Sequence, residues 1–362
     1  MARNPTWPAR SAIAALGLAA ALVGCNDDFT NFTPPVVVNP SLNAFTQTNL
    51  VADVTGTGAV TVDANLVNPW GIAFGPTGTL WVANNGTGTS TLYDSAGTKV
   101  PLVVAVPGAG GAKGAPTGIV FNSTTDFVIP GQGSALFIFA GEDGTISAWN
   151  TSTNTNAMLV ADRSANNSVY KGIAIASNGG ANFLYLTDFR NNHVDVFNAS
   201  FALVQSFTDP GVPAGYAPFG IATIGGKLFV TFAKQLAPDN KDDEAGVGNG
   251  FVDVFNPDGT LVRRFASNGQ LNAPWAVALA PAGFAAFAGD ILIGNFGDGL
   301  IGAYDPNTGA FIDNLRNTSG NPIAIDGLWG LTFGPSAGST KLYFAAGPNG
   351  ETHGLVGTLT HP

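Results

Sequence analysis

The sequence predicts an all-β protein, a six-bladed β-propeller of four-stranded blades, from three observations. A short phrase centred on a small residue recurs six times at steps of 47 to 56 residues, which suits one four-stranded blade per copy. The 48 glycines, 23 prolines and 10% charged residues are typical of many short strands joined by tight turns. The chain stops directly after a third strand, which indicates that an N-terminal strand completes the last blade.

Each copy of the phrase marks the first, innermost strand of a blade. The copies span 69–74, 116–121, 170–175, 218–223, 274–279 and 328–333. An apolar, β-rich second strand follows each copy, at 80–83, 135–139, 184–187, 228–232, 291–294 and 342–345. Third strands alternate and, in five blades, end in an aromatic residue followed by Asp or Asn, as in Tyr93-Asp94. Turn residues such as Asn256-Pro257-Asp258-Gly259 then lead to an outer fourth strand.

The sixth blade lacks a fourth strand of its own, because the chain ends at Pro362. The segment Leu50-Val51-Ala52-Asp53 repeats the pattern of Leu159-Val160-Ala161-Asp162, a fourth strand of the second blade. An unpaired strand edge is a liability that proteins cover. We therefore expect residues 45–53 to pair with the last third strand, so that Leu50 lies near Leu355 and the two ends close the ring.

The first residues have the layout of an export signal. Arg3 and Arg10 precede an apolar run over 12–23, which is too short for a permanent membrane span. The run ends in Leu22-Val23-Gly24-Cys25, which resembles the lipobox of bacterial lipoproteins and implies cleavage before Cys25 and a lipid on its thiol. The alternative is a random cysteine beside an uncleaved hydrophobic anchor.

The predicted organisation is a lipoprotein signal peptide over 1–24, a lipidated disordered tether over 25–44 and the propeller over 45–362. We expect the protein to be exported, anchored to the bacterial cell envelope through Cys25, and monomeric. Cys25 is the only cysteine, so the chain forms no internal disulfide and has no other thiol nucleophile. A formal net charge of −10 disfavours nucleic acid as a partner.

Two strand sequences show a family resemblance. Leu80-Trp81-Val82-Ala83-Asn84 and Val194-Asp195-Val196-Phe197-Asn198 resemble the NHL-type repeat. Residues 45–360 as a whole resemble a family of uncharacterised bacterial exported propellers. The resemblance implies a fold but no mechanism.

Candidate ligand contacts lie on the face that carries the loops entering first strands and the loops between second and third strands. Six residues directly precede the markers: Trp70, Thr117, Lys171, Phe219, Trp275 and Trp329. The four aromatic rings among them either form a stacking platform for sugars or aromatic ligands, or fill space between blades. Arg190, in one of the loops after second strands, is a further ligand-binding candidate.

The same loops suggest a metal site. Oxygen-bearing side chains stand at matching positions of alternate blades or close by: Asn84, Glu142, Asp188 and Asn295. Such a ring suits a calcium-type cation, although Asn and Asp also satisfy loop backbone groups. Gluconolactonase-like and regucalcin-like propellers hold a divalent metal on the axis and hydrolyse lactones or phosphoesters. That resemblance implies a lactonase-like hydrolase, but Trp70 and Gly71 stand where those proteins have a glutamate.

The remaining polar features carry little chemistry. The longest insertion, 235–249, contains Asp239, Asp242, Asp243, Glu244 and Lys241. It lacks a calcium-loop register, and we expect a solvated acidic lid. The histidines His193, His353 and His361 are too few and too scattered to predict a zinc site. The first hypothesis is therefore a non-catalytic scaffold that binds a small ligand, a glycan or an envelope protein, with no cofactor firmly implied; the alternative is the metal-dependent hydrolase.

Overall fold

The structure, a computed structural model, describes residues 38–362. Cys25, the predicted signal peptide and most of the predicted tether lie outside the described residues. Within the part of the chain that the structure describes, no helix is long and apolar enough to cross a membrane.

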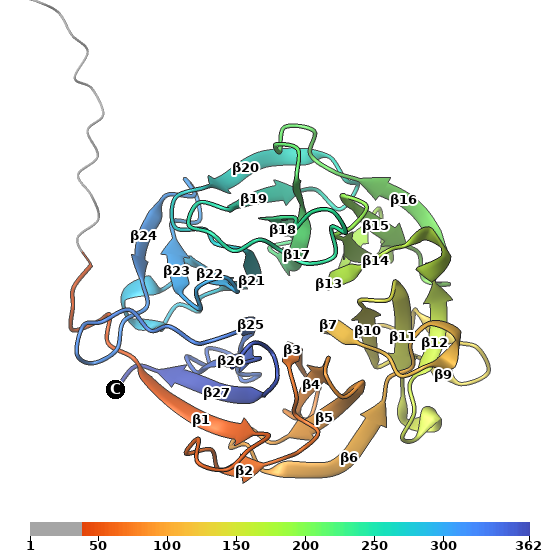
Figure 1. Ribbon diagram of the computed structural model, residues 1–362, viewed down its shortest axis with the longest axis horizontal. Coiled ribbons are helices and arrows are strands. Elements are labelled where there is room, and N and C mark those ends of the chain that lie inside the picture. Colours follow the sequence, from red (N-terminus) through yellow and green to blue (C-terminus); the bar gives the residue numbers. More distant parts are fainter. Residues whose placement is uncertain (1–37) are drawn as a thin grey trace, which may run out of the picture. The chain divides into compact units, whose positions relative to one another are not determined.

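Six antiparallel sheets surround a central axis, and the first strand of each lies innermost (Figure 1). Blade one contains β3 (Pro69–Phe74), β4 (Leu80–Asn84), β5 (Thr89–Tyr93) and β6 (Lys99–Ala105). Blade two contains β7 (Pro116–Phe121), β10 (Phe137–Gly141), β11 (Thr145–Trp149) and β12 (Met158–Asp162), with a small hairpin of β8 (Val128–Ile129) and β9 (Gly133–Ser134). Blade three contains β13 (Tyr170–Asn178), β14 (Ala181–Asp188), β15 (His193–Phe197) and β16 (Leu203–Phe207).

The remaining blades follow the same order. Blade four contains β17 (Tyr216–Ile224), β18 (Lys227–Lys234), β19 (Gly250–Phe255) and β20 (Leu261–Ser267). Blade five contains β21 (Pro274–Leu279), β22 (Ile291–Asn295), β23 (Ile301–Tyr304) and β24 (Phe311–Asn314). Blade six contains β25 (Leu328–Phe333), β26 (Leu342–Ala346) and β27 (Leu355–Thr360), and β1 (Thr46–Ala52) completes it. The six-bladed, four-stranded prediction is confirmed.

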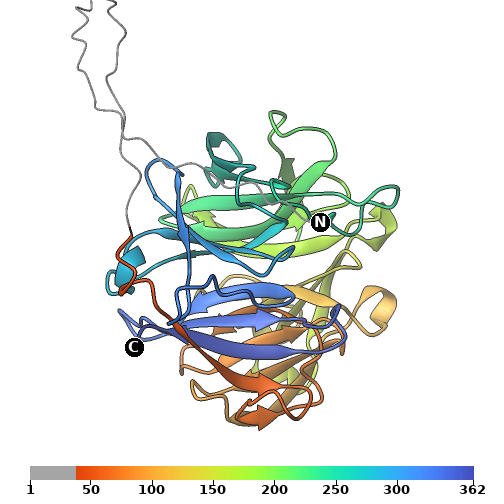
Figure 2. The ribbon, with the colours of Figure 1, turned by 60° about the vertical axis from the view of Figure 1, so that its left-hand side comes forward.

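The two ends of the described chain meet in blade six, as predicted. β1 pairs antiparallel with β27, and its register places Val51 opposite Val356 and Thr46 opposite Thr360. The N-terminal and C-terminal strands lie side by side in two views (Figures 1 and 2). A short strand not expected from the sequence, β2 (Thr61–Val62), adds to β1 in parallel, so blade six has five strands.

The packed chain begins slightly before the predicted propeller boundary at residue 45. Asn43 is buried, its amide donates to the Asp313 carboxylate and the Asn314 carbonyl, and its side-chain oxygen accepts from the Arg316 backbone. Residues 38–44, which the sequence assigns to the tether, therefore include a buried polar side chain that is hydrogen-bonded to blade five.

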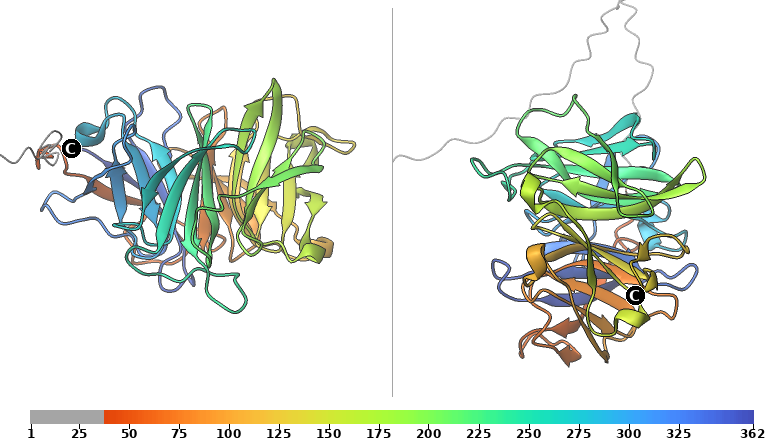
Figure 3. Two further views of the ribbon diagram at one scale, coloured as in Figure 1. Left: turned by 90° about the horizontal axis from the view of Figure 1, so that it is seen from above. Right: turned by 90° about the vertical axis from the view of Figure 1, so that its right-hand side faces the viewer.

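Apolar side chains between neighbouring blades form the core. Trp81 of blade one stacks on Phe137 of blade two with ring centroids 4.0 Å apart. At Gly71 the inner strands of blades one and two approach too closely for a side chain, because a Cβ there would lie 2.7 Å from the Thr117 carbonyl oxygen. The strands cross the thickness of the propeller, so the connecting loops gather at its two faces (Figure 3). The face with the loops between second and third strands is called the loop face below.

Candidate functional site

The predicted aromatic positions meet at the axis, where Trp70, Trp275, Trp329, Phe219 and Phe296 form what we call the axial aromatic cluster. Trp329 stacks on Trp70 with centroids 3.4 Å apart and on Phe296 with centroids 3.9 Å apart. Trp275 contacts both Trp70 and Trp329 edge-on. The predicted rings are all buried, so they pack against one another instead of offering an open stacking surface.

Lys171 is the charged member of the predicted ring, and it is 2% exposed. Its ammonium lies 2.5 Å from a Glu142 carboxylate oxygen, 3.6 Å from Asp242 and 5.0 Å from the centre of the Trp70 ring. Thr117, at the equivalent position of blade two, donates to the Tyr170 carbonyl. The structure therefore brings Lys171 and Glu142 together, one from the ligand-candidate set and one from the metal-candidate set.

Four carboxylates from three blades gather around Lys171: Glu142, Asp242, Asp243 and Glu351. We call this set the carboxylate cluster. Burial opposes ionisation of Glu142, but the neighbouring ammonium of Lys171 outweighs it and holds the pKa of Glu142 below its usual range. Burial likewise favours the neutral amine of Lys171, yet Glu142 prevails and raises the pKa of Lys171. This pair is a charged, mutually stabilised ion pair.

The other two partly buried carboxylates behave differently. Burial, with the charges of Glu351 and Asp242, raises the pKa of Asp243 to about 6 although Lys171 opposes the shift. Burial also raises the pKa of Glu351, helped by the charge of Glu142 and opposed by a hydrogen bond that Asn68 donates at 2.9 Å. In residues 38–362 no salt bridge reaches Asp243 or Glu351.

The other three metal candidates are engaged within their own blades. The Asn84 amide donates to Thr91 at 2.9 Å. The Asp188 carboxylate accepts from the Val169 backbone at 3.0 Å, and Asn295 donates to the Gln270 carbonyl at 2.8 Å. No hydrogen bond in the described chain joins any two of the four predicted metal ligands, and the axial cation stays a prediction.

Arg190, the remaining ligand candidate, is half-buried in the loop of blade three. Its carbonyl and that of Phe189 accept hydrogen bonds from the Gln235 side chain. Among residues 38–362 its guanidinium forms no salt bridge.

The insertion 235–249 is tied to the loop face by its backbone. The Gly248 N–H donates to the Leu271 carbonyl, and the Gly246 N–H donates to the Asn272 side chain. Asp242 is 74% exposed in its side chain, as a solvated lid requires, and lies 3.6 Å from the Lys171 ammonium. Asp243 is partly buried, and the Lys171 charge acts on its carboxylate. The insertion thus contributes to the carboxylate cluster.

Sequence reasoning missed three members of this site: Asn68, Asn85 and Glu351. Asn85 donates to Glu142 at 2.7 Å, and both residues directly follow the second strand of their blade. The signal is this shared position directly after the second strand, whereas Asn84, the last residue of β4, bonds within its blade. The sequence gives no such signal for Glu351, because the loop between β26 and β27 has no counterpart of the same length in the other blades.

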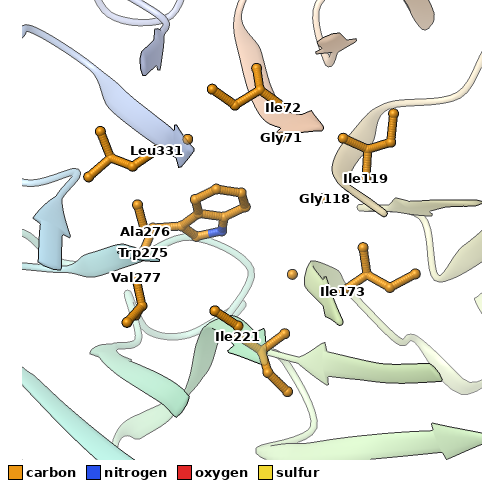
Figure 4. A pocket seen from close by; sticks show the side chains of 13 residues that line it. Gly71, Ile72, Gly118, Ile119, Ile173, Ile221, Trp275, Ala276, Val277 and Leu331 are labelled. Carbon is orange, nitrogen blue, oxygen red and sulfur yellow. The ribbon is translucent and has the colours of Figure 1, made fainter. Parts of the chain in front are cut away.

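Below the aromatic cluster the axis is hollow (Figure 4). The hollow has a volume of about 110 Å³ and opens into a wider depression of about 400 Å³ on the opposite face. Aliphatic side chains from all six inner strands surround it: Ile72, Ile119, Ile173, Ile221, Val277 and Leu331. The indole of Trp275 projects into this space (Figure 4). The side chains that line the hollow are therefore apolar, although the backbones of Gly71, Gly118 and Gly172 also line it. The charged side chains described above lie on the loop face.

Comparison with known proteins identifies sequence relatives of the chain. No family model matches it. It is 36% identical over 324 residues to the uncharacterised protein R648 of Acanthamoeba polyphaga mimivirus, covering 86% of this chain and 78% of that protein. It is 34% identical over 311 residues to the uncharacterised protein L690 of the same virus, covering 82% and 81%. These relatives are viral, and the bacterial origin implied by the resemblance stays a prediction.

Solved structures resemble it in fold. An inactive variant of virginiamycin B lyase from Staphylococcus aureus with quinupristin has a TM-score of 0.53 at 14% identity, covering 87% of this chain and 98% of the lyase. A protein of unknown function from Bacteroides thetaiotaomicron has a TM-score of 0.55 at 12% identity, covering 87% and 76%. At such identities the likeness shows the propeller fold alone. The sequence identity over most of both chains shows that this protein belongs to the family of the mimivirus proteins R648 and L690.

Proposed function

We propose that the protein is a ligand-binding propeller whose loop face takes a small ligand carrying an ammonium group. The observation that carries the proposal is the charge balance around Lys171. The Lys171 ammonium forms a salt bridge with Glu142. Asp243 and Glu351, in contrast, are partly buried carboxylates without a salt bridge in the described chain. A ligand cation between them would supply the missing counter-charge.

The electrostatics favour this occupant over an anionic one. Partly buried carboxylates close to one another resist ionisation, which is why the pKa values of Asp243 and Glu351 are raised. A bound ammonium would reverse that effect and gain charge-assisted hydrogen bonds, which are stronger than neutral ones. The overall acidic charge would also favour a cationic ligand over an anionic one.

Amine titrations test the proposal. Spermidine and putrescine are the probes, 1,4-butanediol is the uncharged control, and tryptophan fluorescence reports binding because Trp70 lies against Lys171. We expect saturable binding of the amines that Asp243→Asn and Glu351→Gln each weaken. Asp239→Asn, in the same insertion but exposed, is the matched control and should bind as the wild type. Absence of saturable binding, or equal weakening by the control, would refute the proposal.

An acid–base enzyme is the second candidate. A carboxyl group with a pKa of about 6 beside a buried lysine suits a general acid or base near neutral pH, and one fold neighbour is a lyase. The test follows quinupristin and a γ-lactone by mass spectrometry after incubation with the wild type and Asp243→Asn. Turnover that the variant lacks would support catalysis, and intact substrates would remove this candidate.

The lactonase-like alternative, with a divalent cation on the axis, is tested separately by a calcium series. Calcium-dependent thermal stabilisation that disappears in Asn295→Ala would support it. Asn84, Asp188 and Asn295 are each held in their own blade, and no hydrogen bond in the described residues joins any two of them, so we expect no such stabilisation.

Export and anchoring through Cys25 remain part of the proposal and rest on residues 1–25 of the sequence alone. Expression of the full chain in a bacterium should place it in the membrane fraction with a labelled fatty acid attached. Cys25→Ser should release it unlabelled. A wild-type protein found in the soluble cytoplasmic fraction would contradict export.

A further inference from the structure

Three metal-ligating side chains meet at the loop end of blade three. Asp188 ends β14, His193 begins β15 and Asp195 follows two residues later. The His193 Nε2 lies 3.1 Å from Asp195 Oδ1 and 3.6 Å from Asp188 Oδ2. One ligand atom from each residue lies within 4.8 Å of the others. This group is separate from the carboxylate cluster around Lys171.

The two carboxylates are held in place by other donors. Tyr170 Oη donates to Asp195 Oδ2 at 2.7 Å, and Ser206 Oγ donates to Asp195 Oδ1 at 2.5 Å. On Asp188, the Val169 backbone donates to Oδ1 and the Asn191 amide donates to Oδ2. Metal-ligating carboxylates are characteristically oriented by such outer hydrogen bonds. Each oxygen nearest His193 therefore accepts one hydrogen bond from another donor and keeps a lone pair for a cation.

The charge of the group is also unbalanced. Asp188 and Asp195 are 0% and 1% exposed, and in residues 38–362 no lysine or arginine forms a salt bridge with either. Only His193 faces both, with a side chain that is 31% exposed. Buried charges are normally paired or coordinate a metal. A divalent ion that takes the place of the His193 proton would neutralise the charges of both carboxylates.

We propose that Asp188, His193 and Asp195 form a binding site for a divalent transition metal, of which Zn²⁺ fits best. A tetrahedral ion with ligand distances of about 2.0–2.2 Å separates its donor atoms by roughly 3.4 Å, which the two His193 distances bracket. One imidazole and two carboxylates are a zinc-compatible set. The exposed side of His193 leaves a fourth position for water or a ligand, the arrangement of sites that do chemistry.

The test is calorimetric titration of Zn²⁺ into the metal-stripped full chain carrying Cys25→Ser, because that thiol itself binds zinc. We expect one equivalent of Zn²⁺ to bind and Co²⁺ to give visible absorption bands of a low-coordinate site. His193→Gln should weaken Zn²⁺ binding by at least the roughly 10–100-fold that loss of an outer hydrogen-bond partner costs, since it removes a direct ligand.

His353→Gln is the matched control. His353 also contacts a carboxylate, Asp53 at 2.8 Å, but only one, so its replacement should leave Zn²⁺ binding unchanged. Thermal unfolding of both variants without metal checks that each is folded. No binding to the wild type, or unweakened binding to folded His193→Gln, would overturn the proposal.

Discussion

Lys171 should contribute more to stability than any ordinary surface lysine, because its replacement would leave Glu142 without its cation in a largely buried place. Removing one partner of a buried pair costs about 3–5 kcal/mol. The Glu142 side chain is 27% exposed and keeps the hydrogen bond from Asn85, so it retains part of its solvation. We therefore expect Lys171→Met to lower the free energy of unfolding by about 2–3 kcal/mol.

Urea unfolding at pH 7 measures this cost, with Lys234→Met as the matched control. Lys234 also pairs with a glutamate, Glu244 at 2.6 Å, but its side chain is 38% exposed and that of its partner 44%. Exposed pairs of this kind contribute little to stability. Adding Glu142→Gln to Lys171→Met should recover part of the loss. If the two lysine variants cost the same, or the second substitution restores nothing, the reasoning about a buried charge is wrong.

Three further predictions follow from the fold and the site. Val51→Ala should cost about 2 kcal/mol in urea unfolding, at about 0.8 kcal/mol per buried carbon plus a cavity, whereas Thr48→Ala on the exposed part of the same strand should cost little. Gly220→Ala should make the axial tryptophans more accessible to fluorescence quenchers in the solvent, because the new Cβ would lie 1.9 Å from the Trp275 carbonyl oxygen. An unchanged quenching constant would contradict this. The pKa of Asp243 is raised to about 6, so protonation of Asp243 increases the free energy of unfolding. This contribution is fully present below about pH 4 and is lost as pH rises through 6. Asp243→Asn should remove that loss, and an identical pH profile of unfolding would argue against a partly buried carboxyl group.

The repeat allowed the fold to be predicted in detail, and the site only in part. The pairing of β1 with β27 followed from counting strands, because an unpaired edge in the last blade had to be covered. Glu142 and Lys171 were both identified as candidates, yet in separate sets, since nothing in a repeat alignment says that a loop of blade two contacts the first strand of blade three. Three scattered histidines do not predict a zinc site, because the sequence does not show that Asp188 and Asp195 converge on His193.

The sequence by itself determined the order of the four strands in each blade, how many blades there are and how the ring closes, but not the short strands β2, β8 and β9. These features depend on local periodicity and on the number of strands, and both can be read from the order of residues. Only the tertiary structure decided that the axial tryptophans pack on one another, that Asp243 is partly buried, and that two buried aspartates converge on His193. Such convergence depends on the directions of side chains and on loops of unequal length from different blades. The distances between these side chains are set only when the blades pack around the axis.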